Sequence, residues 1–289
     1  MFENKKICIF GGTGTIGSLI VEYIITQNPS VIRVFCNDEN SLYEAQQRWG
    51  YGSSNNIRYL LGDIRDIDRC ILALKDIDYV FNCAAVKHVD ICEFNPSEAY
   101  KTNVIGLDNI INASVYRNVK KLLHISTDKA VEPTTLMGAT KMISERILQM
   151  RWAQNPEVNM ICVRMGNILD SRGSILPKIR EQKAKGLPIT ITNPEMERFW
   201  ISQKECVKFI MNAFENGKKG EIWVPKLKEI NLMEFVRKEV GKDYTIDIIG
   251  NRKGEKLREK LLSEYEIMIA DQTKKGVWII PNEVWYSEL

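Results

Sequence analysis

The sequence has few of the residues on which metal and disulfide chemistry depend. Histidine occurs only twice, at His88 and His124, so a metal site built on histidine is not expected. The seven cysteines are odd in number, scattered, mostly inside apolar stretches, and form no Cys-x-x-Cys pair. We therefore expect small buried thiols in a reducing compartment, and no metal.

Long apolar runs and charge of one sign are also missing. Apolar runs, such as 122–123 and 279–280, fall far short of the roughly 20 residues that a helix needs to cross a bilayer. The start of the chain has no signal-peptide pattern. Forty basic and 37 acidic residues leave a formal charge of +3, too balanced for a general polyanion-binding surface. We expect a cytoplasmic protein with no membrane span and no nucleic-acid partner.

What the chain does have is a regular alternation of apolar strands and amphipathic helices. Of its 289 residues, 44% are hydrophobic and 27% charged, which is typical of one large globular domain or two fused ones. The patterns predict strands at 6–10, 31–36, 57–61, 79–83, 121–126 and 159–164, and helices that include 18–26, 95–116 and 138–150. This order predicts the α/β class, with a Rossmann-type doubly wound parallel sheet.

The texture of the sequence changes after about Gly166. Prolines at 177, 188, 194 and 225 interrupt shorter elements, among which we expect a helix at 232–240 and a strand at 244–249. We therefore predict a Rossmann domain with the catalytic residues at 1–166 and a smaller substrate-binding portion at 167–289.

A glycine turn lies directly between the first strand and the first helix. Gly11, Gly14 and Gly17 form a G-x-x-G-x-x-G pattern, which permits a tight turn and lets backbone N–H groups approach a pyrophosphate at the helix N-terminus. The turn predicts a dinucleotide site, to which we also assign Thr13, Thr15 and Ile16. The alternative is a simple glycine loop.

The end of the second strand bears on the choice of nicotinamide cofactor. A carboxylate there binds the ribose 2′-hydroxyl and repels a 2′-phosphate. Around Asn37 the strand end holds no acid, although Asp38 follows at once. The pattern favours NADP and leaves NAD open.

The segment Ser126-Thr127-Asp128-Lys129, followed by Met137-Gly138-Ala139-Thr140-Lys141, resembles the catalytic strand and helix of a short-chain dehydrogenase/reductase. Its usual tyrosine is replaced by Met137, which keeps the spacing of one helical turn from Lys141. A thioether cannot give or take a proton, so neighbouring residues must carry the acid–base chemistry. Asp128 and Lys129 stand beside each other as an acid and a potential base.

The whole chain resembles the nucleotide-sugar 4,6-dehydratases of the extended short-chain dehydrogenase/reductase group, in particular those acting on UDP-N-acetylglucosamine. The matching stretches cover nearly the whole sequence in the family's order: 84–89, 102–106, 126–130, 163–167, 171–174, 196–200 and 254–257. Several relatives with methionine at this place carry membrane helices ahead of the enzyme domain, and we expect this chain to be a short, soluble version.

The resemblance implies an internal redox cycle on the sugar. Hydride leaves C4 for the cofactor, water is eliminated across C5 and C6, and the hydride returns to C6, giving a UDP-4-keto-6-deoxy-N-acetylhexosamine for surface glycan synthesis. Oxidation at C4 acidifies the C5 proton, and the resemblance makes Lys129 the base that removes it. Asp128 would protonate the departing C6 hydroxyl, Thr127 would hydrogen-bond the C4 oxygen, and Lys141 would hold the nicotinamide ribose.

The resemblance also assigns binding residues. On the cofactor side, Asp63 with Ile64 would contact adenine, a turn-forming aspartate being the alternative, and Ala84 and Ala85 would present small side chains. On the substrate side, Arg172 and Arg198 would bind the UDP diphosphate, in line with the fork geometry of arginine. The remaining candidates are Asn167 near the sugar or first phosphate, Glu255 at the uridine ribose, and Lys87, Glu93 and Asn103 as polar groups near the sugar. Relatives often carry histidine where this chain has Arg258, and family members generally associate, so we expect a homo-oligomer.

Other readings remain open at this point. The same fold could release a 5,6-unsaturated sugar, epimerise C5 after elimination, or act as a UDP-sugar epimerase; the loss of the tyrosine removes one potential second base and favours retention at C5. A protein that binds NADP as a sensor or scaffold without turnover is the alternative of another class. For the individual residues, the alternatives are a solvated Asp128–Lys129 ion pair, an ordinary surface Lys141 and a Met137 that only fills the core.

Overall fold

The chain folds around one large twisted sheet with helices on both faces. The computed structural model describes residues 1–50, 56–272 and 275–282. Eight strands in the order β13-β10-β6-β5-β4-β1-β2-β3 form the sheet, and all neighbours in it are parallel except the β10–β13 pair. Their bounds are β1 (Lys6–Phe10), β2 (Val31–Cys36), β3 (Ile57–Leu61), β4 (Tyr79–Asn82), β5 (Lys121–Thr127), β6 (Asn159–Met165), β10 (Ile222–Pro225) and β13 (Val277–Ile280). The predicted Rossmann-type α/β fold is confirmed.

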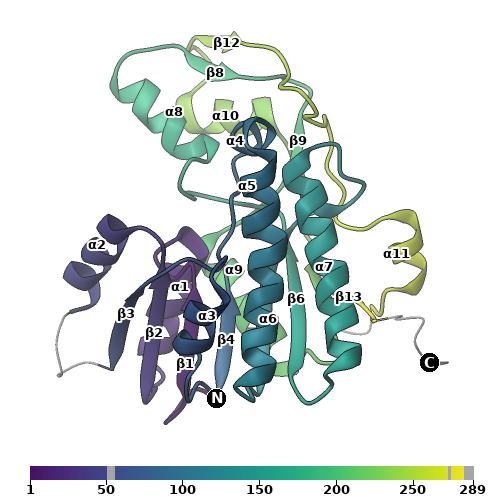
Figure 1. Cartoon of the computed structure of the whole chain (residues 1–289). Helices are drawn as coiled ribbons and strands as arrows, with labels where there is room; N and C mark the ends of the chain where they lie inside the picture. The colour runs from purple at the N-terminus through teal and green to yellow at the C-terminus, as the bar shows by residue number, and fades with distance from the viewer. Residues whose placement is uncertain (51–55, 273–274, 283–289) are drawn as a thin grey trace.

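Two separate apolar clusters cover the two faces of the sheet. One joins the strands to α1 (Thr15–Ile25) and α9 (Gln203–Asn216), and the other joins them to α3 (Ile67–Ala73), α6 (Gly106–Tyr116) and α7 (Leu136–Gln154). α2 (Glu39–Trp49) lies at the β3 edge of the sheet (Figure 1). Because the strand order reverses between β1 and β4, a crevice is expected at the carboxyl ends of these strands.

The helix expected over 95–116 consists of three segments. α5 (Pro96–Tyr100) passes through a π-helical turn, Lys101–Ile105, into α6, after the short helix α4 (Val89–Phe94). Single π-helical turns are rare and frequent at functional sites. This one carries the buried Asn103, whose amide accepts the N–H of Val86 at 2.8 Å and donates to its carbonyl at 3.0 Å. The loop after β4 is thereby fixed to the interior of the protein.

A smaller lobe stands beyond the carboxyl ends of the sheet strands (Figure 1). It contains α8 (Ile175–Ala184), α10 (Leu232–Val240) and the strand pairs β8 (Ile189–Ile191) with β12 (Ile246–Ile248), and β9 (Glu197–Ile201) with β7 (Asn167–Ile168) and β11 (Glu229–Asn231). Its own core includes Ile179, Ile189, Trp200 and Val236. The chain returns twice to the large sheet, through β10 before β11 and through β13 after β12, so residues beyond 166 also build the Rossmann sheet. The division of the chain at residue 166 stays a prediction.

A buried ion cluster attaches the C-terminal segment to the sheet. The guanidinium of Arg164 on β6 donates to Glu145 on α7 at 2.7 Å and to Glu266 on α11 (Glu264–Ile269) at 2.8 Å. It also donates to the carbonyl of Leu261 at 2.8 Å. All three charged side chains are buried, so the two carboxylates depend on the arginine for compensation.

Several elements have the predicted bounds, and the ends of others differ from them by one to four residues. The helix expected from residue 138 begins at Leu136, because the side chain of Thr135 accepts the N–H of Gly138. The helix at Leu232–Val240 has the bounds that the pattern predicted. No helix in the described part of the chain is both long and apolar enough to cross a membrane.

Candidate active site

The glycine turn between β1 and α1 has no room for side chains. Gly11 has φ +70°, and a Cβ placed on it would lie 2.7 Å from the backbone nitrogen of Ala84. A Cβ on Gly17 would lie 2.2 Å from the carbonyl oxygen of Gly11. The N-cap residue, Gly14, makes no side-chain capping bond, so no side chain occupies the positive end of α1. These features fit a dinucleotide diphosphate lying against the helix N-terminus.

The carboxylate after β2 is engaged in capping a helix. Asp38 accepts the N–H of Asn40 at 2.9 Å, the N–H of Ser41 at 3.3 Å and the hydroxyl of Ser41 at 3.0 Å. The hydrogen bonds from Ser41 lower the pKa of Asp38. Nearby, Thr13 donates its hydroxyl to the sulfur of Cys36 at 3.0 Å, and Asn37 is exposed. Asp38 and Thr13 are therefore held in place by hydrogen bonds within the chain.

Asp63 and Ile64 follow β3 and both make structural contacts. Asp63 accepts the N–H of Arg65 at 2.9 Å and forms an ion pair with its guanidinium at 2.6 Å. Partial burial works in the opposite direction, but these bonds from Arg65 lower the pKa of Asp63. Ile64 is buried and leaves no space for a side chain at Gly106. A contact of either residue with adenine stays a prediction.

The candidate acid and base lie at the end of β5, as the sequence motif suggests. The strand ends at Thr127, and a 3₁₀ turn, Asp128–Ala130, follows. The Thr127 hydroxyl donates to Oδ1 of Asp128 at 2.9 Å, and Nζ of Lys129 lies 3.0 Å from the same oxygen. Asp128 is fully buried, and its Oδ2 has no hydrogen-bond partner among the described residues.

Lys129 lies next to two further polar groups. Its Nζ is 3.5 Å from Oδ1 of Asn167 and 3.4 Å from Oε1 of Glu259, a buried residue of the C-terminal loop. Burial alone would lower the pKa of this lysine, but Asp128 and Glu259 raise it above its ordinary value. The resting lysine therefore carries a proton. Glu259 was not among the residues predicted from the sequence, since no local spacing indicates a contact between positions 130 residues apart.

Lys141 is buried and belongs to a row of polar groups. It donates to the carbonyl of Ile125 at 2.7 Å and lies 3.5 Å from Nε2 of His124, whose Nδ1 is 3.2 Å from the Asn82 amide. Burial lowers the pKa of Lys141 to about 8. One turn earlier, Met137 is buried and packs with Cys92 and Ala99. Lys141 is thus no ordinary surface lysine, while Met137 belongs to a small apolar cluster.

The low pKa of Lys141 predicts a pH-dependent stability. Between about 8 and the ordinary value of 10.5, the folded protein binds fewer protons than the unfolded chain, so the unfolding free energy should rise with pH in this window. Lys141→Met removes the titrating group and should remove this rise. Urea unfolding of both proteins across the window tests it, and parallel pH dependences would contradict the prediction.

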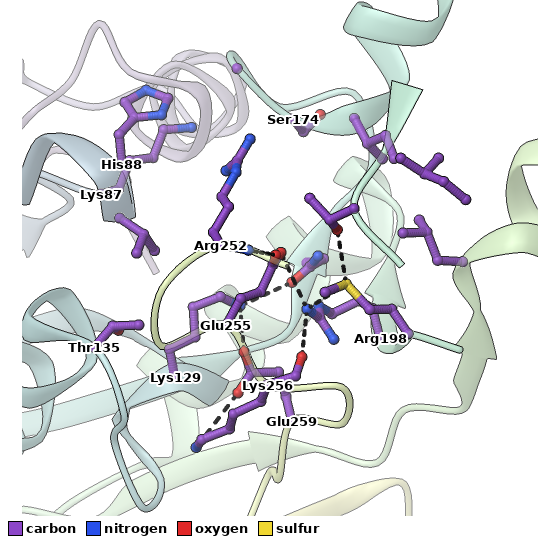
Figure 2. A pocket seen from close by; sticks show the side chains of 18 of the residues that line it. Lys87, His88, Lys129, Thr135, Ser174, Arg198, Arg252, Glu255, Lys256 and Glu259 are labelled. Atoms are coloured by element: carbon purple, nitrogen blue, oxygen red, sulfur yellow. Dashed lines mark hydrogen bonds and ion pairs between the residues drawn. The ribbon is translucent and has the colours of Figure 1, made fainter. Parts of the chain in front are cut away.

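A cavity of about 300 Å³ lies beside Lys129, between the sheet edge and the smaller lobe (Figure 2). Among the predicted residues, it is lined by Lys87, Lys129, Asn167, Arg198 and Glu255. Ser174 and Trp200 also line it, and their hydroxyl and indole N–H have no partner among the residues described. The cavity thus combines basic groups with unpaired donors, which suits an anionic, polar ligand.

The two predicted diphosphate arginines differ in placement. Arg198 is buried, donates to the carbonyls of Lys256 and Leu257 at 2.9 Å each, and lies 3.7 Å from Glu255. It therefore holds the C-terminal loop at the cavity wall. Arg172 is exposed; its N–H donates to the hydroxyl of Thr15 at 3.0 Å, and its carbonyl accepts from Lys87. A diphosphate contact stays a prediction for both.

Glu93 and Asn103 are used by the scaffold. Glu93 accepts the N–H of Leu136 at 2.7 Å and so caps the N-terminus of α7, and Asn103 fixes Val86 and donates to Thr140 at 3.0 Å. Ala84 and Ala85 follow β4, and the backbone of Ala84 lies against Gly11. The sequence predicted these residues as site residues, but it did not predict the contacts that position them.

Comparison with known proteins agrees with this geometry. A family model described as polysaccharide biosynthesis protein matches residues 7–281. The chain belongs to this family. With it, the predicted membership of the extended short-chain dehydrogenase/reductases is confirmed, and the chain is related to dehydratases and epimerases of nucleotide sugars.

Three relatives match this chain over most of their own length. An uncharacterised membrane protein of Methanocaldococcus jannaschii is 43% identical, covering 98% of this chain and 88% of the relative. The inverting UDP-N-acetylglucosamine 4,6-dehydratase of Campylobacter jejuni is 38% identical, covering 91% and 79%. The UDP-glucose 4-epimerase of Rickettsia akari is 36% identical, covering 98% and 84%. Among solved structures, Pen from Bacillus thuringiensis is 37% identical with a TM-score of 0.91, covering 97% of this chain and 89% of Pen.

Proposed function

We propose that the protein is a UDP-N-acetylglucosamine 4,6-dehydratase that converts its substrate into a UDP-4-keto-6-deoxy sugar. The observation that carries this proposal is the contact between Asp128 and Lys129 at 3.0 Å, beside a cavity lined by basic groups and next to a dinucleotide turn. An acid and an amine in contact can exchange the protons that an elimination of water requires. The named dehydratase from Campylobacter jejuni supports the choice of sugar.

The cofactor that the glycine turn fits is a nicotinamide dinucleotide, which when bound would accept a hydride from C4 and return it to C6. We propose NADP, because the carboxylate of Asp38 is already engaged by the N–H groups of Asn40 and Ser41 at the start of α2. NAD remains the alternative. Gly11, Gly14 and Gly17 would approach the diphosphate, and Lys141 would contact the nicotinamide ribose.

Because the resting Lys129 carries a proton, the cycle starts from the fraction of the enzyme in which this proton has been released to solvent. From a carboxylate and a neutral amine, the proton steps then balance. The C4 hydroxyl proton passes through the Thr127 hydroxyl to Asp128, along the 2.9 Å hydrogen bond between them. Lys129 then removes the C5 proton, and Asp128 donates its proton to the departing C6 hydroxyl, which leaves as water. Finally Lys129 returns its proton to C5, and both groups regain their starting forms. Met137 takes part in none of these steps.

The remaining residues would orient the substrate. Asn167 lies within 3.5 Å of Lys129 and would bind the sugar next to the base. Lys87, Arg172 and Arg198 would supply positive charge for the diphosphate, and Glu255 would accept from the uridine ribose.

The proposal is tested by mass spectrometry of reactions with a panel of UDP-hexoses in deuterated water. We expect UDP-N-acetylglucosamine to lose one water and the product to carry one solvent deuterium at C5, since Lys129 exchanges its proton with solvent. If no UDP-hexose loses water, the proposal is wrong.

A second candidate is a UDP-sugar 4-epimerase, which the 36% identity to the Rickettsia akari enzyme favours. An epimerase gives a product of unchanged mass, so the same experiment separates the two activities. A proton NMR spectrum of the product further separates retention at C5 from epimerisation or a released 5,6-unsaturated sugar. Cofactor binding without any turnover would instead indicate a sensor or scaffold.

A further inference from the structure

We propose that Glu259 is a positioning residue that holds Lys129 in its charged form and so sets the pH range in which this lysine can act as the base. The inference rests on the proposed dehydratase function. It concerns a residue of the C-terminal loop that touches the candidate base without touching the reacting carbons.

The Glu259 carboxylate is buried at the bottom of the cavity wall between two lysines. The residue is 6% exposed; Oε1 lies 3.4 Å from Nζ of Lys129, and Oε2 lies 3.7 Å from Nζ of Lys256 (Figure 2). Within the described residues, Oε2 accepts no hydrogen bond. A buried carboxylate with an unsatisfied oxygen is costly, and the opposite charge of the two nearby ammonium groups offsets part of this cost.

The loop that carries Glu259 is fastened on both sides of this residue. On one side, Arg198 donates to the carbonyls of Lys256 and Leu257, and Thr134 donates to the carbonyl of Gly254 at 2.7 Å. On the other side, the carbonyl of Leu261 accepts from the buried Arg164. The position of the carboxylate next to Lys129 is therefore a product of the fold and does not depend on one flexible side chain.

The charged groups near Lys129 carry both signs. Asp128 and Glu259 favour the ammonium, Arg198 opposes it, and Lys256 faces it only across Glu259. Asn167 is polar and uncharged. Burial lowers the pKa of Lys129, so the net rise in its pKa means that the two carboxylates together outweigh burial and Arg198. Asp128 is needed for the proton steps, which leaves Glu259 as the group whose role is electrostatic.

The experiment compares Glu259→Gln, Glu259→Asp and the wild type by the pH dependence of kcat/KM for UDP-N-acetylglucosamine. Removing an opposite charge at this distance should move the ascending limb, which reports deprotonation of Lys129 in the free enzyme, to lower pH by about one unit. At pH values below this limb, the fraction of Lys129 in its neutral form should be about tenfold larger in Glu259→Gln than in the wild type. Glu259→Asp keeps the charge, so its limb should stay close to that of the wild type even if its maximal rate falls. Glu264→Gln, an exposed carboxylate on the same segment, is the matched control.

A second measurement does not require turnover. Reductive methylation with ¹³C-formaldehyde labels lysine amines, and the Lys129 resonance is assigned by its absence in Lys129→Met. Its titration midpoint should fall by about one unit in Glu259→Gln and stay unchanged in Glu264→Gln. An unchanged or higher midpoint in Glu259→Gln overturns the inference. If the wild type processes no UDP-sugar while the midpoint still falls, the proposed function fails and the coupling of Glu259 to Lys129 stands.

Discussion

Replacing Lys129 by methionine is expected to lower the rate of water elimination by about 10²- to 10⁴-fold, the usual contribution of a positioned acid or base. Methionine keeps the length of the side chain and loses the amine that removes the C5 proton. Because the C5 proton then has no acceptor, solvent deuterium should also stop entering the sugar. Both effects are measured by mass spectrometry of the reaction mixture.

The matched control for this prediction is Lys178→Met. Lys178 also lines the cavity, but it comes from α8 in the smaller lobe and is exposed. Its replacement removes one positive charge from the same cavity and should leave the C5 exchange intact. If Lys129→Met retains the wild-type rate of exchange, another group is the base, and the mechanism proposed from the Asp128–Lys129 contact is wrong.

Arg164→Met should have the largest effect on stability. The substitution leaves Glu145 and Glu266 buried without their shared partner, and breaking a buried ion pair in this way costs about 3–5 kcal/mol. Urea unfolding at neutral pH measures the loss. Arg180→Met, which removes an exposed arginine paired with Asp170, is the control and should cost at most about 1 kcal/mol.

The same cluster predicts the sign of the acid response. Burial acts to raise the pKa of Glu266, but its bonds to Arg164 hold it below the ordinary value of 4.5. This stabilisation is present above that value and is lost as the pH falls through the lowered pKa. In Arg164→Met the partnerless carboxylates gain stability from protonation, so the difference between variant and wild type should shrink on acidification. A constant difference would show that the charges do not cause it.

The sequence predicted the sheet because its signals are local. Each apolar strand run is shorter than ten residues, and the glycine turn directly follows the first strand at Gly11. The Thr127–Lys129 motif lies at a strand end. Short-range patterns were therefore sufficient to predict these features. The contacts that build the cavity are of another kind. Glu259 reaches Lys129 and Arg164 reaches Glu266 across about 100 residues or more, and no periodicity records such pairings. For the same reason, the structural bonds of Glu93 and Asn103 could not be foreseen.

The bond between Arg172 and Thr15 has a consequence for how the enzyme would handle its coenzyme. Thr15 opens α1 at the dinucleotide turn, while Arg172 belongs to the loop that leads into the smaller lobe, and its carbonyl accepts from Lys87 beside the cavity. The loop after β7 is thus bonded to the first residue of α1, beside the proposed dinucleotide site. A hydride that returns to the molecule it came from leaves nothing to be regenerated between turnovers. The coenzyme is then expected to behave as a resident prosthetic group, staying in place and copurifying with the protein while successive sugars enter and leave.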